Sequence, residues 1–309
     1  MTDYISMPLV DADRLMSEDR VLDTMTEMPW RFGENIPVAL NPDNSGIWTD
    51  LPGGGRIWQL GIHSEGALSL NLTFGRYRLP RGAELFVYAA DRSRILGAFT
   101  HMNNQQDGVF ATTLLPASSI VVEYYEPAGS EFPGELEINS VTHGYRDAFS
   151  YAKAFGQAGW CNVNVACDIA LPWQNQIDAV VMMVVGSNGF CTGALVNNTS
   201  FNGRPLVLSA NHCLRDPSTV VFWFNWQSAA CANPSVSPPH DALSGAVTRA
   251  RSSLTDFWLL ELNHEVPVAY RPYYAGWNRS LESGMGGPII GIHHPRGDIK
   301  KFSYAQGVT

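Results

Sequence analysis

All five cysteines of this 309-residue chain lie in one stretch of its second half, and this placement limits the folds that the chain can adopt. The five are Cys161, Cys167, Cys191, Cys213 and Cys231. Cysteines clustered in this way are typical of a domain cross-linked by disulfides in an oxidising compartment. We therefore predict a disulfide-bearing domain behind a cysteine-free one, with one cysteine left over because the number is odd.

The first residues do not show which compartment this is. Residues 1–6 contain no basic stretch followed by an apolar one, which a secretion signal would have. Two interpretations stay open: either the start of the sequence is incomplete, or the chain is cytosolic and its cysteines are reduced.

Charge divides the chain at nearly the same place. The whole net charge of −9 lies in residues 1–155, whereas residues 156–309 carry equal numbers of acids and bases. An acidic chain is a poor nucleic-acid binder, because such binding needs clustered Lys and Arg. The longest apolar run, residues 179–185, is far shorter than the roughly 20 residues of a membrane helix. We expect no nucleic-acid partner and no membrane span.

The hydrophobic pattern predicts an all-β chain with two domains. Residues 1–30 are an acidic lead-in, read as a short amphipathic helix or a loose segment. Period-two alternation between turn signals then predicts a β-sandwich over 31–147, with strands at 56–63, 67–73, 84–88 and 119–125. An Ala- and Gly-rich linker follows at 148–160. The second domain, 161–309, has strand-like runs at 180–185, 191–196, 205–209, 220–224 and 257–262.

One histidine of the second domain is placed where a catalytic base could act. His212 follows a small-residue strand end, and Cys191 and Cys213 flank the hairpin that leads to it. A disulfide between them would hold the imidazole rigidly, as a general base requires. The alternative is a structural histidine beside a buried cysteine.

A carboxylate could orient that histidine. Asp256 directly precedes the apolar strand expected at 257–262. A carboxylate buried there would need a partner, and an imidazole N–H would satisfy it and fix the ring tautomer. The alternative is an exposed aspartate at a strand start.

These residues carry a resemblance. The segment 209–213, Ser-Ala-Asn-His-Cys, resembles the Thr-Ala-Ala-His-Cys signature around the histidine of chymotrypsin-like serine proteases, although Asn211 replaces an alanine. Over 161–305 the chain is similar to bacterial lysyl endopeptidases. The motifs that carry this similarity are 161–167, 191–199, 209–213, 222–231, 255–263, 275–278 and 292–295.

The resemblance implies specific roles. His212 would be the general base and Asp256 its orienting carboxylate, and the disulfides would be Cys191–Cys213 and Cys167–Cys231. The chain would be a secreted, extracellular serine endopeptidase that acts on peptides or proteins, with a preference for lysine or other basic residues and no cofactor.

The family's nucleophile is missing from this sequence. The family places its serine in a stretch like Gly-Asp-Ser-Gly-Gly-Pro, and none follows the histidines at 293 and 294. Ser283 lies in a disrupted version, Glu-Ser-Gly-Met-Gly-Gly-Pro, but it follows Asp256 too closely, and Met285 interrupts the turn that an oxyanion hole needs. We expect the serine and the partner of Cys161 beyond Thr309. The second domain would then be an incomplete double β-barrel, and this chain would be inactive.

The first domain also resembles a known segment. Residues 27–146 are similar to the pro-region of related secreted endopeptidases, through 31–33, 56–60, 85–88, 97–100 and 123–127. The resemblance implies a zymogen whose pro-region contacts the catalytic domain within one chain. We expect processing in the linker, for which Lys153 is a candidate because no other lysine precedes residue 300.

The sequence is also compatible with other functions. The chain could be a non-catalytic secreted adhesin-like binding protein with a degenerate protease fold, or a cytosolic structural or metal-binding protein. No metal site is expected, because His293 and His294 point to opposite faces of a strand and no pair of cysteines has zinc-site spacing. The aromatic residues between 222 and 226 belong to the core or line a substrate face.

Overall fold

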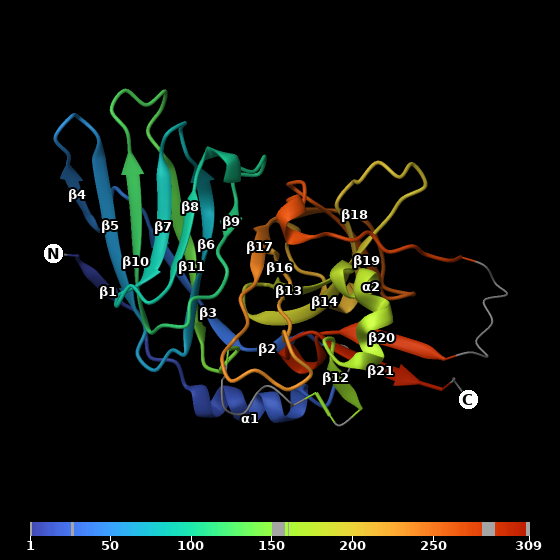
Figure 1. The fold of residues 1–309 in the computed structure, drawn as a ribbon. Helices are drawn as coiled ribbons and strands as arrows, with labels where there is room; N and C mark the ends of the chain where they lie inside the picture. Colours follow the sequence, from blue (N-terminus) through green and yellow to red (C-terminus); the bar gives the residue numbers. More distant parts are fainter. Residues whose placement is uncertain (1, 26–27, 150–157, 160, 280–287, 307–309) are drawn as a thin grey trace. The chain divides into compact units, whose positions relative to one another are not determined.

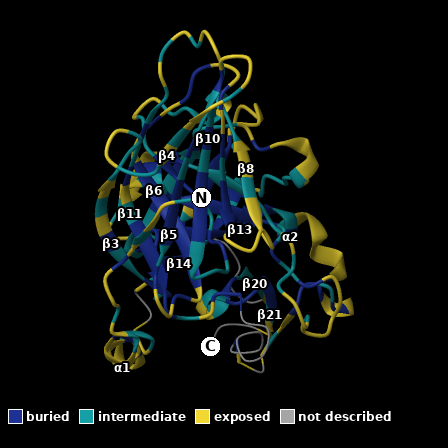
Figure 2. Ribbon diagram, turned by 90° about the vertical axis from the view of Figure 1, so that its left-hand side faces the viewer, coloured by how far each residue is buried: buried dark blue, intermediate teal, exposed yellow. Residues whose placement is uncertain are grey.

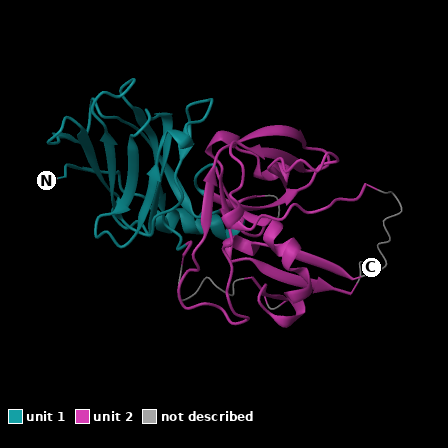
Figure 3. Cartoon of the chain, turned by 45° about the horizontal axis from the view of Figure 1, so that its top comes forward, with its two compact units in different colours: residues 1–21, 31–147, 186–188 teal, residues 22–30, 148–185, 189–309 magenta. Residues whose placement is uncertain are grey.

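The computed structural model describes residues 2–25, 28–149, 158–159, 161–279 and 288–306. It is an all-β fold, as predicted, with two α-helices among these residues, α1 (Ala12–Leu22) and α2 (Gln174–Ala179) (Figure 1). The chain forms two compact units (Figure 3). Unit 1 comprises residues 1–21, 31–147 and 186–188, and unit 2 comprises residues 22–30, 148–185 and 189–309. Neither described helix is long and apolar enough to cross a membrane.

Unit 1 contains two β-sheets. The first has the order β1-β5-β10-β7-β8, with β4 paired to β5, and the second has the order β3-β11-β6-β9. The strands are β1 (Tyr4–Ser6), β3 (Gly33–Leu40), β4 (Ile47–Asp50), β5 (Arg56–His63), β6 (Ser69–Arg78), β7 (Glu84–Ala89), β8 (Ile95–Phe99), β9 (Phe110–Ala111), β10 (Ser119–Glu126) and β11 (Glu135–Gly144).

One hydrophobic core lies between these sheets, so unit 1 is a β-sandwich. Leu60 and Val122 come from the first sheet, Leu72 and Val141 from the second, and all four belong to a single buried cluster. The period-two pattern explains this arrangement, because alternate side chains of a strand point to the same face. Figure 2 shows the buried residues running along the central strands, while most of α1 is exposed.

The acidic lead-in contains the amphipathic helix that its sequence suggested. Within α1, Leu15 and Asp19 are buried. The Asp19 carboxylate accepts hydrogen bonds from Arg31 Nε and Tyr145 Oη, each at 2.8 Å. A buried carboxylate needs such partners, so the helix is attached to unit 1 by a specific ion pair as well as by its apolar face.

Unit 2 is built on a sheet that closes on itself. Its order is β17-β16-β13-β14-β15-β19-β18, and β2 (Trp30–Arg31) pairs with β14. The strands are β13 (Val180–Val185), β14 (Gly189–Val196), β15 (Leu206–Ser209), β16 (Val221–Phe224), β17 (Asp241–Ser244), β18 (Ala246–Ser252) and β19 (Phe257–Leu262).

Gly245 alone separates the two edge strands β17 and β18. Its N–H donates to the Val220 carbonyl at 2.8 Å, and its own carbonyl accepts from the Asn263 N–H at 3.1 Å. The two edges are therefore one bent strand that is hydrogen-bonded on both sides, which closes the sheet into a barrel. The φ of +85° at this bend favours glycine.

A smaller sheet completes unit 2. It has the order β12-β21-β20, formed by β12 (Asn162–Asn164), β21 (Lys301–Ala305) and β20 (Ile289–His293). Val165, Ala170, Ile177 and Phe302 form a small buried cluster there. This part of the unit thus has a much smaller core than the barrel.

An ion-pair network joins two strands of the barrel and the segment that leads into a third. Glu261 on β19 accepts hydrogen bonds from Arg204 and from Arg249 on β18, and these bonds lower the pKa of its carboxyl group. We expect Glu261→Gln to lower the free energy of unfolding by about 1 kcal/mol at pH 7. A carboxyl with a lowered pKa stabilises the fold above its ordinary pKa, so the difference should shrink as the pH falls below about 4. Urea unfolding at both pH values tests this, and an equal loss from Glu265→Gln, an exposed position, would contradict it.

Candidate active site

His212 lies where strand β15 ends at the rim of the barrel. It is the central residue of a short 3₁₀ turn, Asn211–Cys213, which begins two residues after Ser209. The Ser209 hydroxyl donates to the Thr192 carbonyl at 2.8 Å, and Cys213 is bonded to Cys191. The hydrogen bond and the disulfide both join this segment to β14, so the backbone is fixed on each side of the histidine.

Asp256 reaches this histidine from the neighbouring strand. It occupies the turn before β19 in a left-handed conformation, with φ +48°. The pairing of Ser209 with Trp258 aligns the end of β15 with the start of β19. Asp256 Oδ2 lies 2.7 Å from His212 Nδ1, and Oδ1 accepts from the His212 backbone N–H at 2.9 Å. Two contacts thus fix the ring and its backbone against one carboxylate.

Of the two interpretations of Asp256, the structure shows the exposed aspartate at a strand start. Its side chain is 49% exposed, because it sits in the turn at the barrel rim and not within the apolar strand. Hydrogen bonds from the His212 side chain and then from its backbone lower the pKa of the carboxyl group. The carboxylate is therefore ionised near neutral pH, and it orients Nδ1–H toward itself. In this tautomer Nε2 is free to accept a proton.

The electrostatic coupling can be measured directly. We expect the Asp256 carboxyl to titrate below its ordinary value of 3.8. In His212→Ala the side-chain hydrogen bond is lost, so the pKa should rise toward that value. Carboxyl chemical shifts recorded against pH would show both midpoints, with the exposed Asp168 as the internal reference. Equal Asp256 midpoints in the two proteins would contradict the coupling.

Both predicted disulfides are present in the structure. Cys167 is bonded to Cys231, and Cys191 to Cys213, while Cys161 is an exposed free thiol. One grouping of potential metal ligands occurs among the described residues, His212 with Cys191 and Cys213. Its two sulfurs are joined to each other, so they offer no thiolate to a metal.

The remaining candidates have structural surroundings or lie outside the described residues. His294 is buried, stacks on Trp226 and lies with Nδ1 3.0 Å from the Asp298 carbonyl, and burial holds its pKa well below the ordinary range. Burial also lowers the pKa of His293. The aromatic side chains at 222, 223, 224 and 226 are fully buried, which favours core packing over a substrate face. Ser283 and Lys153 fall outside the described residues.

One support of the site had no signal in the sequence. The Thr192 carbonyl accepts a hydrogen bond from the Ser209 hydroxyl. The Thr192 hydroxyl accepts a hydrogen bond from the His294 backbone N–H at 3.0 Å. Thr192 therefore connects the strand end before His212 to the segment that follows β20. A threonine at this position looks like any other strand residue until the pairing of β14 is known.

Comparison with known proteins assigns this chain to a family. The family model described as lysyl endopeptidase, C-terminal domain, matches residues 155–309. The chain is also 28% identical over 291 residues to a protein of Pseudomonas aeruginosa named lysyl endopeptidase. That similarity covers 85% of this chain and 61% of the relative, so the chain spans about three-fifths of the relative's length. With half of its residues matched by the family model, the chain belongs to the lysyl endopeptidase C-terminal domain family.

Proposed function

We propose that this chain supplies the general base and the orienting carboxylate of a secreted serine endopeptidase that cleaves after lysine or other basic residues. The observation that carries the proposal is the double contact of Asp256 with His212, 2.7 Å to Nδ1 and 2.9 Å to the backbone N–H. A carboxylate placed in this way fixes the tautomer that a base needs. The preference for a basic residue rests on the family alone.

The proposed chemistry is acyl transfer. His212 Nε2 removes the proton from a serine hydroxyl as the oxygen attacks the peptide carbonyl. The resulting imidazolium, stabilised by Asp256, gives the proton to the leaving amine, and water then hydrolyses the acyl-enzyme by the same route. No Gly-x-Ser-Gly stretch occurs in these 309 residues. We propose that the serine lies outside these residues in a longer form of the protein, which the greater length of the relative supports.

We propose further that unit 1 is the pro-region of this enzyme and contacts the catalytic domain within the chain. Barrels are rich in non-local contacts and fold slowly, so a sandwich that folds first can assist them. The excess negative charge of residues 1–155 would keep the precursor soluble. Two disulfides in unit 2 support an oxidising, extracellular destination. Processing is proposed within 148–160, with Lys153 as the candidate site.

The proposal is tested on the full-length protein. Hydrolysis of matched peptide esters that differ only in Lys, Arg or Ala before the cleaved bond should favour Lys, and a serine-directed reagent should stop it. N-terminal sequencing of the mature enzyme should give a first residue within 148–161. A full-length protein with no esterase activity would contradict the proposal and favour a binding protein on a protease fold.

A further inference from the structure

Unit 2 includes two aromatic side chains that precede the proposed processing site. Trp30 belongs to β2, and Phe149 is the second residue of the predicted linker. The predicted linker begins with two buried residues, since Ala148 and Phe149 are only 4% and 5% exposed. A cut after Lys153 would leave both aromatic residues on the N-terminal fragment. After the cut, these two side chains would bind the surface of unit 2 as part of a separate fragment.

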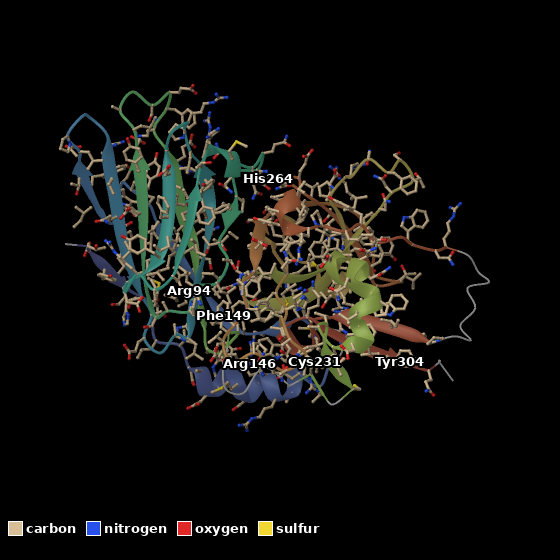
Figure 4. The ribbon with its side chains drawn as sticks, viewed as in Figure 1. Arg94, Arg146, Phe149, Cys231, His264 and Tyr304 are labelled. Atoms are coloured by element: carbon tan, nitrogen blue, oxygen red, sulfur yellow. A yellow bond between two sulfur atoms is a disulfide. The ribbon has the colours of Figure 1, made fainter. Side chains whose placement is uncertain are left out.

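These two side chains lie on one continuous row of rings (Phe149 is labelled in Figure 4). Trp30 stacks on Phe190 with ring centroids 5.8 Å apart and planes 4° from parallel. Phe149 stacks on Trp223, also at 5.8 Å, and on His240 at 6.4 Å. Phe190 meets Trp223 edge to face at 5.5 Å. In this row Phe190 and Trp223, which follow the processing site, are flanked by Trp30 and Phe149, which precede it.

The fold of unit 2 makes room for Trp30. A Cβ added to Gly297 would lie 2.8 Å from both the Trp30 and the Phe190 rings. A larger residue at position 297 would collide with the two rings, so the absence of a side chain there allows Trp30 to stack on Phe190. Phe190 and Trp223 are 3% and 0% exposed, so removal of Trp30 and Phe149 would bring apolar ring surface into contact with water.

We propose that Trp30 and Phe149 are a two-point aromatic anchor that keeps the N-terminal fragment bound to unit 2 after the linker is cut. The occupant is this chain's own N-terminal fragment, and the inference rests on the proposed precursor role. Two anchors on one fragment bind more tightly than either alone, because the second binds at a high effective concentration. Processing and release are then separate events. Release requires both rings to leave Phe190 and Trp223, and the hydrogen bonds between Ser187 and residues 71 and 73 to break.

The test uses the 309-residue chain cut to completion after Lys153 with a lysine-specific protease. The other lysines, Lys300 and Lys301, are 1% and 2% exposed and should resist cutting. The two fragments should co-elute in size-exclusion chromatography at micromolar concentration. Phe149→Ala and Trp30→Ala should each raise the concentration of half-dissociation at least tenfold, and the double variant should raise it further.

Matched variants keep the result specific. Phe201→Ala removes a ring that is 78% exposed in unit 2 and should change nothing. Phe149→Leu retains apolar bulk but lacks the stacked ring, so we expect an effect between those of the wild type and Phe149→Ala. Circular dichroism of each uncut chain shows whether a variant has a folding defect. Wild-type fragments that separate, or single variants that behave like Phe201→Ala, would overturn the anchor. The measurement needs no hydrolysis by the chain itself. The anchor proposal can therefore be contradicted while the peptidase proposal stands.

Discussion

Asp256→Asn is expected to lower kcat for peptide hydrolysis by the full-length protein about 10⁴-fold, and His212→Ala by at least as much. The reason is the geometry at the barrel rim, where the carboxylate contacts Nδ1 at 2.7 Å. An asparagine that donates its NH₂ to Nδ1 would favour the tautomer with the proton on Nε2. A protonated Nε2 cannot accept a proton from serine. Steady-state kinetics with a peptide that has lysine before the cleaved bond give kcat and KM separately, and KM should change little.

Controls exist within the same unit. His264→Ala removes another imidazole, and Asp168→Asn removes another carboxylate. Both variants should retain kcat within about threefold, because neither side chain takes part in the two hydrogen bonds that join His212 to Asp256. A loss in Asp256→Asn no larger than that in Asp168→Asn would show that Asp256 does not orient the base.

Removal of the Cys191–Cys213 disulfide is expected to lower both stability and activity. A bridge across 22 residues stabilises a fold by about 3 kcal/mol, mainly through the entropy of the unfolded chain. The double variant Cys191→Ala with Cys213→Ala should show this loss in urea unfolding. Because Cys213 directly follows His212, the folded full-length variant should also lose kcat.

The second disulfide provides the matched control. Cys167–Cys231 spans 64 residues, so its removal should cost more, about 4 kcal/mol. It does not adjoin His212, so the folded fraction of that variant should keep its kcat. In the 309-residue chain, Cys161→Ser replaces an exposed free thiol and should leave the free energy of unfolding unchanged. The account is contradicted if the bridge at 167 and 231 proves more important for kcat than the bridge at 191 and 213.

Strict patterns in the sequence predicted the strands well. The runs at 56–63 and 257–262 match β5 and β19, because their apolar residues face a core at every second position. Strand β11 was not predicted. Its pairing with both neighbours shifts register between Ile138 and Ser140, and a bulge breaks the alternation that marks a strand. Strand β18 was also missed, because most of its side chains are exposed and its sequence is largely polar.

The site was predictable in its members and less so in its surroundings. A histidine beside a cysteine and an aspartate before an apolar strand suggested the pair, and the structure brings His212 and Asp256 together. The sequence left the burial of Asp256 open, because a residue next to a strand can lie either in the strand or in the turn before it. The burial of Phe149 was missed for a different reason. Its ring partner Trp223 is remote in sequence, and an Ala- and Gly-rich composition does not indicate such a contact.

The central claim is that His212, oriented by Asp256, activates a serine. The most direct measurement is the rate at which a phosphonylating reagent labels the full-length protein, followed by identification of the labelled residue by mass spectrometry. We expect one serine to be labelled stoichiometrically in the wild-type protein, and at least about 10³-fold more slowly in His212→Ala, because an unassisted hydroxyl is a weak nucleophile. Equal labelling rates in the two proteins, or no labelled serine in the wild type, would contradict the account.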